Sequence, residues 1–309
     1  MALCLRRSVA DLPGLIGLAS RHASFQFHTS TVAPQIPEVP KETVDFGYQS
    51  VPRTEKETLV GGVFRSVAPS YDVMNDLMSA GMHRVWKDRL VEKLRPFPGM
   101  RHLDVAGGTG DVAFRVLRAL REAEAAARPQ VPGPGPSRSA PPQKGTVVIA
   151  DINPAMLLEG RKRAAGEGID SYDLEWVEAS AETLPFPDDS MDSYTISFGI
   201  RNVTDRDAAL REAKRVLRPG GRFLCLEFSK VVVPGLQQLY DLYSFAVIPQ
   251  IGRLVANDGA SYQYLVESIR MFPDQESWAR QLEAAGLVGV EYENLMGGVV
   301  AIHSGFKLH

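Results

Sequence analysis

The chain has 309 residues, of which 44% are hydrophobic and 23% are charged. This composition can build a sizeable hydrophobic core and excludes disorder throughout the chain. The formal net charge of -3 lacks the basic excess of nucleic-acid-binding proteins and favours an enzyme that acts on small molecules. The two cysteines exclude a disulfide framework, and the six histidines, which lack metal-ligand spacing, predict no bound metal ion.

The N-terminal leader differs in composition from the rest of the chain. Residues 1–30 contain three arginines among many Ser, Thr and Ala, with Asp11 as the single acidic residue. This is the composition of an amphipathic mitochondrial transit peptide. A frayed terminus without a targeting role is the alternative, and a secretory signal fits less well because Pro13 interrupts the apolar run. We predict a transit peptide and disordered leader over residues 1–40 and a functional domain over residues 41–309.

The sequence of residues 41–309 predicts an α/β architecture. From Glu55 to Leu94 apolar residues recur at helical spacing, and Pro96 ends this region. Short β-rich segments then alternate with amphipathic helices, which is typical of a parallel sheet built from βαβ units. The predicted strands are 102–106, 146–151, 174–179, 192–198, 222–228, 288–294 and 299–306, and the predicted helices are 111–127, 153–166, 206–217 and 275–285. We therefore predict a doubly wound, mostly parallel seven-stranded sheet with helical additions.

Three segments depart from this alternation. Residues 128–145 are rich in proline and predict a disordered insert. Residues 231–272 are rich in Leu, Ile and Tyr and predict a helical insert on the substrate side of the sheet. Within it, the apolar stretch Leu236–Val255 suits a wall for a hydrophobic chain, and equally a core or a dimer face. The sequence RPGG at 218–221 predicts a helix stop and a turn before the fifth strand.

The sequence HLDVAGGTGD at 102–111 predicts a strand, a glycine turn and a helix start. Gly108 and Gly110 permit a tight turn and the close approach of a ligand to the helix N-terminus. With Ala113 the loop also satisfies the dinucleotide pattern, and a plain turn without a ligand is a further alternative. Asp104 favours S-adenosylmethionine, because its carboxylate would attract the cationic amino acid part of that cofactor and repel the pyrophosphate of NAD.

Asp151 ends the second predicted strand in the sequence TVVIADIN. An acidic residue at this position can accept hydrogen bonds from both ribose hydroxyls of an adenosine cofactor. The separation from the glycine loop exceeds the usual value of about 20 residues, and the proline-rich insert accounts for the excess. The alternative is that Asp151 caps the following helix.

Further stretches make the sequence more specific: ASAETLPFPDDSMD, TISFGIRN, RVLRPGGRFLCLEFSK, VAPSYDVMNDLMSAGMHRVWK and LVANDGASYQYLVESIRMFPDQE. Together with HLDVAGGTGD and ADIN, they resemble the ubiquinone/menaquinone biosynthesis C-methyltransferase family of class I S-adenosylmethionine-dependent methyltransferases. The likeness runs from about Thr54 to the C-terminus. It implies a Rossmann-like fold, S-adenosylmethionine as methyl donor, and C-methylation of a polyprenylated methoxy-benzoquinol ring in coenzyme Q biosynthesis.

The resemblance also implies cofactor contacts at Thr109, Asp151, Ser180, Ala181 and Ser197. The position of Ser180 is commonly Asp or Asn in such proteins, where the longer side chain would bond the adenine amino group. The shorter serine predicts weaker adenine binding or a bridging water. An ordinary loop hydroxyl is the alternative for Ser180.

Candidate catalytic residues follow the fourth predicted strand. Arg201 and Asn202 in FGIRN should lie at the C-terminal edge of the sheet, where open α/β sheets bind ligands. Arg201 would stabilise a developing phenolate or position a water that takes the proton, and Asn202 would orient a ring oxygen. Tyr71, Asp258 and Tyr262 lie in family-like stretches and are candidates for the quinol pocket, with a helix cap or a core tyrosine as the alternative.

Two other functions stay open at this point: a nicotinamide-dependent oxidoreductase, which Asp104 disfavours, and a non-catalytic scaffold of the same biosynthetic complex. The resemblance and the leader imply a peripheral position on the matrix side of the mitochondrial inner membrane. They also imply other coenzyme Q biosynthesis proteins as partners in a multi-subunit complex, and a homodimer is a further candidate. No nucleic-acid partner is expected.

Overall fold

The computed structural model describes residues 42–67, 75–76, 79–127, 144–170, 173–238 and 259–309. The predicted transit peptide, most of the proline-rich insert, Tyr71 and Asp258 lie outside these residues.

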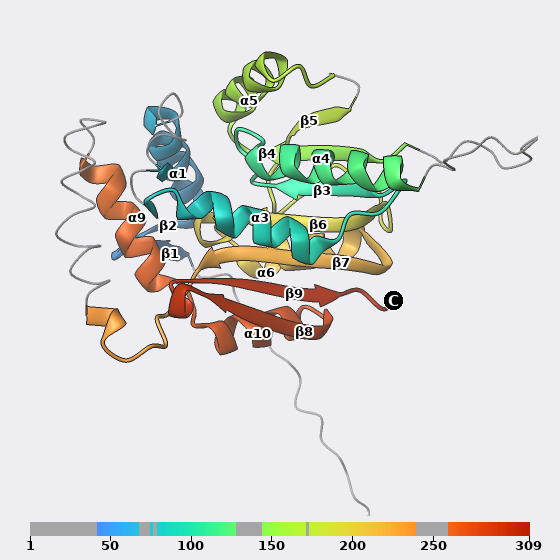
Figure 1. Cartoon of the computed structure of the whole chain (residues 1–309). Helices are drawn as coiled ribbons and strands as arrows, with labels where there is room; N and C mark the ends of the chain where they lie inside the picture. Colours follow the sequence, from blue (N-terminus) through green and yellow to red (C-terminus); the bar gives the residue numbers. More distant parts are fainter. Residues whose placement is uncertain (1–41, 68–74, 77–78, 128–143, 171–172, 239–258) are drawn as a thin grey trace, which may run out of the picture. The chain divides into compact units, whose positions relative to one another are not determined.

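The described part is built on a seven-stranded sheet with the strand order β5-β4-β3-β6-β7-β9-β8 (Figure 1). Its strands are β3 Arg101–Val105, β4 Thr146–Asp151, β5 Leu174–Glu178, β6 Met191–Ser197, β7 Leu217–Phe228, β8 Val288–Leu295 and β9 Val300–Phe306. The first five pair in parallel, and β9 runs antiparallel to both β7 and β8. All seven predicted strands are therefore confirmed, as is the mostly parallel sheet.

Helices cover both faces of this sheet. They are α1 Arg53–Val67, α3 Met82–Leu94, α4 Asp111–Ala126, α5 Pro154–Gly166, α6 Arg206–Val216, α9 Gly259–Met271 and α10 Gln275–Ala284, with short 3-10 helices at Ile200–Asn202 and Met296–Gly298. Alternate residues of a strand enter different cores: Phe223 and Cys225 pack with α6 and α10, whereas Leu224 and Leu226 pack with α3 and α4. Burial on both faces explains why the sequence of this strand is a continuous apolar run.

The predicted turn at 218–221 is wrong in its placement. Helix α6 ends at Val216 and β7 begins at the next residue. Met191 of β6 pairs with Leu217, while Ser193 already pairs with Arg222. The proline and glycines between them form a bulge within the strand, because they are extra residues on one side of the ladder. Proline fits there since it has no N–H to donate.

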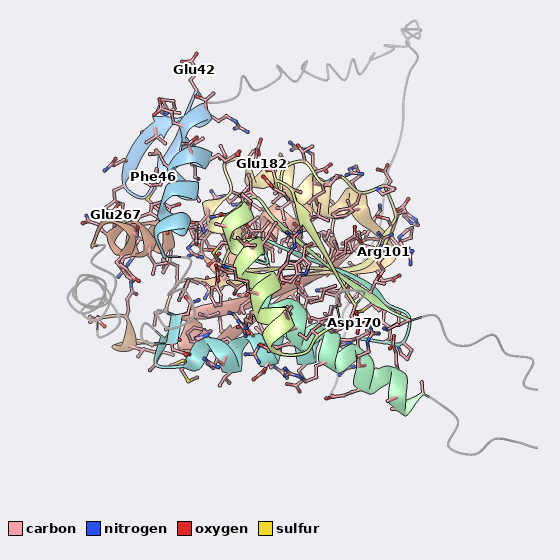
Figure 2. All side chains as sticks on the ribbon, turned by 90° about the horizontal axis from the view of Figure 1, so that it is seen from above. Glu42, Phe46, Arg101, Asp170, Glu182 and Glu267 are labelled. Atoms are coloured by element: carbon pink, nitrogen blue, oxygen red, sulfur yellow. The ribbon has the colours of Figure 1, made fainter. Side chains whose placement is uncertain are left out.

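A hairpin that the sequence analysis did not predict precedes the first helix. Strands β1 Thr43–Phe46 and β2 Gln49–Pro52 pair antiparallel. The Phe46 ring stacks on Tyr264 of α9 with a centroid separation of 4.2 Å, and the Tyr48 N–H donates to Glu267 at 3.0 Å. Figure 2 shows Phe46 and Glu267 on these neighbouring elements. The hairpin is thereby attached to α9, and α1 is attached to the start of α6 by an ion pair of 2.7 Å between Arg53 and Asp205.

Helix α9 lies in the last part of the segment 231–272, for which the sequence predicts a helical insert, and residues 239–258 lie outside the description. Within the described residues, none of the helices combines the length and the apolar character that a membrane crossing requires.

We predict that Gly160→Ala destabilises the fold. A Cβ at this position of α5 would lie 2.4 Å from Cζ3 of Trp176, whose ring also packs against the glycine loop. Such overpacking costs about 1–3 kcal/mol. The matched control is Gly166→Ala at the end of the same helix, where a Cβ meets no atom within 4 Å. Urea unfolding should show a loss for the first variant only, and equal stabilities would contradict the packing role.

Candidate cofactor and active site

The glycine loop between β3 and α4 has a backbone that most residues cannot adopt. A Cβ on Gly107 would lie 2.7 Å from Cγ2 of Ile149 and 3.1 Å from the backbone oxygen of Asp104. Gly110 precedes α4 with a φ of 83°, which favours glycine. These constraints press the loop against the sheet and leave the N-terminus of α4 open to a ligand.

Asp151 at the end of β4 holds this loop. One carboxylate oxygen accepts the N–H of Gly108 at 2.8 Å, and the other accepts the N–H of Asn153 at 2.8 Å. Burial raises the pKa of Asp151, and the two backbone donors oppose this shift. The cap of α5 is Asn153, whose side chain accepts the Ala155 N–H at 3.0 Å. The structure therefore does not support the alternative that Asp151 is the helix cap.

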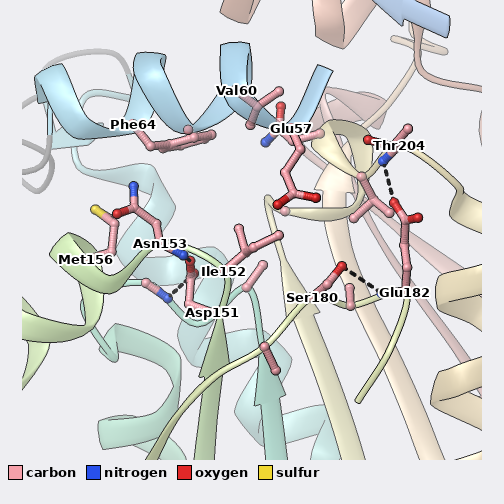
Figure 3. A pocket seen from close by; sticks show the side chains of 18 of the residues that line it. Glu57, Val60, Phe64, Asp151, Ile152, Asn153, Met156, Ser180, Glu182 and Thr204 are labelled. Carbon is pink, nitrogen blue, oxygen red and sulfur yellow. Dashed lines mark hydrogen bonds between the residues drawn. The ribbon is translucent and has the colours of Figure 1, made fainter. Parts of the chain in front are cut away.

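A cavity of about 830 Å³, counted out to its opening, lies at the C-terminal edge of the parallel strands (Figure 3). Helix α1 contributes Glu57, Val60 and Phe64 on one side, and the end of β4 with the start of α5 faces them (Figure 3). Six of the predicted site residues line it: Gly108, Asp151, Ser180, Ala181, Ser197 and Asn202. The cavity has the position expected for a cofactor site.

A smaller cavity adjoins the first one at the glycine loop. The two share Ala106, Gly108, Ser197 and Phe198, and the smaller one is also lined by Asp104 and Thr109. Gly110 lines neither cavity and acts through the backbone of the loop.

Asp104 carries a polar atom without a partner. This residue is 1% exposed, and its Oδ1 accepts from the Thr195 hydroxyl at 2.7 Å. Within the described part, Oδ2 of Asp104 and Oγ of Ser197 are buried and have no hydrogen-bond partner. Burial raises the pKa of Asp104 to about 7. Buried polar atoms of this kind usually have a partner, so these two atoms fit a bound ligand.

Lys87 is a site residue that the sequence analysis missed. It is 6% exposed on α3, lines the smaller cavity, and donates to Oδ2 of Asp111 at 2.8 Å. Although burial alone would raise the pKa of Asp111, Lys87 and two arginines lower it to about 2. Lysines on amphipathic helices are usually exposed, and the sequence carried no other signal for this one. The cavity therefore presents a cation beside the Asp104 carboxylate.

Arg201 lies in the 3-10 helix after β6 but does not line the large cavity. It is 9% exposed, and its Nη1 donates to Oε1 of Glu227 at 2.9 Å and to the Phe198 carbonyl at 2.5 Å. The guanidinium also lies over the Phe228 ring, 5.6 Å from its centroid. Burial raises the pKa of Glu227, and Arg201 opposes this shift. The arginine is thus held in place by a buried ion pair that sequence reasoning did not anticipate.

Asn202 lines the large cavity, and its Oδ1 accepts from the Tyr264 hydroxyl at 3.0 Å. Burial raises the pKa of Tyr264 to about 12, which keeps this donor protonated. The predicted substrate residue Tyr262 is buried in α9, whereas Tyr264, which was not predicted, contacts a candidate catalytic residue.

Comparison with known proteins agrees with this arrangement. A family model described as the ubiE/COQ5 methyltransferase family matches residues 53–307. The chain belongs to the ubiE/COQ5 methyltransferase family. It is an S-adenosylmethionine-dependent methyltransferase, so the predicted enzyme class and methyl donor are confirmed.

The family members it resembles include plant and bacterial proteins. It is 57% identical over 264 residues to the mitochondrial 2-methoxy-6-polyprenyl-1,4-benzoquinol methylase of Oryza sativa, covering 85% of this chain and 88% of that protein. It is 54% identical to the ubiquinone/menaquinone biosynthesis C-methyltransferase UbiE of Dinoroseobacter shibae, covering 86% and 98% of the two chains.

Solved structures confirm the predicted fold of this methyltransferase. The putative methyltransferase in complex with the Trm112 activator of Haloferax volcanii superposes with a TM-score of 0.53 at 17% identity, covering 80% of this chain and 98% of that one. A SAM-dependent methyltransferase from Aquifex aeolicus gives a TM-score of 0.50 at 15% identity, covering 76% and 96%.

The unpartnered Asp104 oxygen predicts a pH dependence of cofactor binding. Between about pH 5.5 and 7 the α-amino group of S-adenosylmethionine is protonated, since such groups have a pKa of about 7.7–8.0. A cation at Asp104 favours the ionised carboxylate and lowers its pKa, so binding releases a proton. The association constant should therefore rise by up to about tenfold per pH unit over this range. Titration calorimetry measures it, and Asp104→Asn should remove the slope. An unchanged slope in that variant would assign the titration to another group.

Proposed function

We propose that this methyltransferase transfers the methyl group of S-adenosylmethionine to a ring carbon of a polyprenylated methoxy-benzoquinol in coenzyme Q biosynthesis. The observation that carries the proposal is the 57% identity, over 85% of this chain, to a relative named for the methylation of that quinol. The cavity at the C-terminal edge of the sheet supports it, because it joins an adenosine-type site to polar groups suited to a quinol.

The residues that line the large and the small cavity would bind different parts of the cofactor. Asp151 would bind the ribose hydroxyls through the lone pairs that its backbone donors leave free. Ser180 and Ala181 would border the adenine. Asp104 would bind the α-ammonium group, and Lys87 with Thr109 would hold the α-carboxylate. The bound cofactor supplies an electrophilic methyl group on a sulfonium.

The protein's own residues then prepare the acceptor ring. The nucleophile is a ring carbon made electron-rich by a hydroxyl group, and phenols ordinarily have a pKa near 10. Asn202, oriented by Tyr264, holds a ring oxygen. Arg201 anchors the 3-10 helix that carries Asn202, through Glu227 and the Phe198 carbonyl. The C–C bond forms as the S–C bond breaks, and the ring carbon loses its proton to a water in the cavity. Arg201 is not the base, because a guanidinium stays protonated.

The substrate also suggests where the enzyme works. A polyprenyl quinol resides in lipid, and several relatives are named mitochondrial. We infer that residues 1–40 direct import and that the enzyme binds peripherally to the matrix face of the inner membrane, with other coenzyme Q biosynthesis proteins as partners. Val232 and Val233 are exposed at the start of the segment 231–272, where a lipid surface or a second copy of the chain would bind.

Incubation of the purified enzyme with methyl-labelled S-adenosylmethionine and a short-tailed methoxy-benzoquinol tests the reaction. The label should appear on a ring carbon, identified by the fragmentation of the product in mass spectrometry. Label on a ring oxygen, or no transfer by an enzyme that binds the cofactor, would overturn the proposal.

Loss of the Asp151 carboxylate, which would bind the ribose, should weaken cofactor binding. We expect Asp151→Ala to cost about 1.5–3 kcal/mol of binding free energy, the scale of hydrogen bonds to a charged group. Calorimetric titration with S-adenosylmethionine measures the loss. Because Asp151 also holds the glycine loop, Asp151→Asn serves as a milder variant, and Glu175→Ala on the exposed side of β5 is the control. Unchanged affinity in a folded Asp151→Ala variant would remove this residue from the site.

Arg201→Lys should separate catalysis from cofactor binding. Lysine keeps the charge but loses the planar fork that reaches both Glu227 and the Phe198 carbonyl. Turnover should fall at least about tenfold, or about 1.4 kcal/mol. The affinity for S-adenosylmethionine should persist, because Arg201 does not line the large cavity. Near-normal turnover would show that Arg201 has only a structural role.

A further inference from the structure

A third cavity, which is polar, is lined by Arg201 and lies between the β1–β2 hairpin, α1, the start of α6 and α9. Its volume is about 670 Å³ out to its opening. Among their lining residues, it shares only Val203 and Thr204 with the cofactor cavity. The reaction described above leaves this space unused.

Two cations in this cavity lack acidic partners. Lys56 is 6% exposed, and its ammonium donates to the Val203 carbonyl at 3.2 Å. Arg206 lies over the Phe272 ring, 5.7 Å from its centroid. Among the described residues, no carboxylate oxygen lies within 4.0 Å of either cation. Arg201 differs from both, because Glu227 neutralises it.

The acidic groups nearby are occupied elsewhere or exposed. Glu182 accepts the backbone N–H groups of Thr204 and Asp205, each at 2.9 Å. Asp205 pairs with Arg53 and caps α6. Asp45 lines the cavity but is exposed on the hairpin. Of the other carboxylates near Arg206, Asp207 is exposed and Glu227 pairs with Arg201. The interior of the cavity is therefore positive, with one solvated carboxylate at its edge.

The pKa values show that nearby carboxylates offset the burial of these two cations only in part. Burial, and then the charge of Arg206, lower the pKa of Lys56 to about 8. Burial also lowers the pKa of Arg206. The charge of Asp45 raises both pKa values, but neither it nor the other nearby carboxylates outweigh the effect of burial.

We propose that this cavity binds a phosphate group, with Lys56 and Arg206 as its charged ligands. A phosphate dianion matches two cations in one site, and the hydroxyls of Thr43 and Thr204 at the wall are further donors. The group is either free phosphate or the headgroup of an acidic phospholipid. Its binding neutralises the interior and joins the hairpin, α1 and α6, of which α1 also lines the cofactor cavity.

Titration of the full-length protein with inorganic phosphate tests this site, with potassium chloride at equal ionic strength as the reference. Calorimetry should show saturable binding, and the melting temperature should rise with phosphate concentration. Lys56→Met and Arg206→Gln should each weaken binding at least tenfold. The control, Lys162→Met, removes an exposed lysine of α5 that pairs with Glu159, and should change nothing.

A variant expected to strengthen phosphate binding keeps the test valid if Lys56→Met fails to fold. Asp45→Asn removes the repulsive carboxylate at the edge, so it should bind phosphate at least twofold more tightly. The absence of saturable phosphate binding by the wild-type protein would overturn the proposal. Wild-type affinity in folded Lys56→Met and Arg206→Gln variants would overturn it as well.

Flotation with vesicles identifies the source of the phosphate group. Vesicles of phosphatidylcholine with one fifth phosphatidic acid should retain the protein if the group belongs to a lipid, and both Lys56→Met and added phosphate should release it. If phosphate binds in calorimetry but vesicle binding does not respond to either change, the ligand is free phosphate. Since every readout is a binding measurement, these results do not depend on whether the quinol is the methyl acceptor.

Discussion

The carboxylate of Asp151 is the interaction on which the geometry of the cofactor site depends. Loops at the C-terminal edge of a parallel sheet have no neighbouring strand to hold them. Asp151 replaces that support, because its two oxygens accept the N–H groups of Gly108 and Asn153 and so join β4 to the glycine loop and to α5. Hydrogen bonds to an ionised group are strong, and each oxygen keeps lone pairs for a ligand. The same group thus shapes the cavity and faces into it.

Charge pairing distinguishes the groups that hold the fold from those that face a ligand. Arg201 and Glu227 form a buried pair of 2.9 Å, so their cost of desolvation is offset within the protein. Oδ2 of Asp104 has no such partner in the described part, and Lys56 and Arg206 lack a carboxylate there. Unpaired buried charges raise the free energy of the ligand-free state, which a ligand of opposite charge lowers. The cofactor side therefore presents an Asp104 oxygen without a hydrogen-bond partner, whereas the cavity of Lys56 and Arg206 presents cations without an ion-pair partner among the described residues.

The segment 42–67 lines both the cofactor cavity and the cavity of Lys56 and Arg206. Successive residues on a helix are about 100° apart, so adjacent positions of α1 face different cavities. Glu57 lines the cofactor cavity, and Lys56 lines the cavity that also contains Arg206. The preceding hairpin contacts Tyr264, which in turn donates to Asn202 in the cofactor cavity. A displacement of this segment would alter both sites together. Figure 1 shows α1 and α9 at the same end of the sheet, where the two sites lie.

The sequence by itself determined the seven strands, the glycine loop and the family, because these features depend on local periodicity and on contiguous motifs. It also indicated Asp151, whose position at a strand end is set by topology. Only the tertiary structure showed that Glu227 pairs with Arg201 and that Lys87 lines the same small cavity as Asp104. It alone revealed the hairpin, whose short strands carry little apolar alternation and are stabilised by α9. These features depend on contacts between residues far apart in the chain, and no local pattern encodes which distant side chain will complete a buried charge.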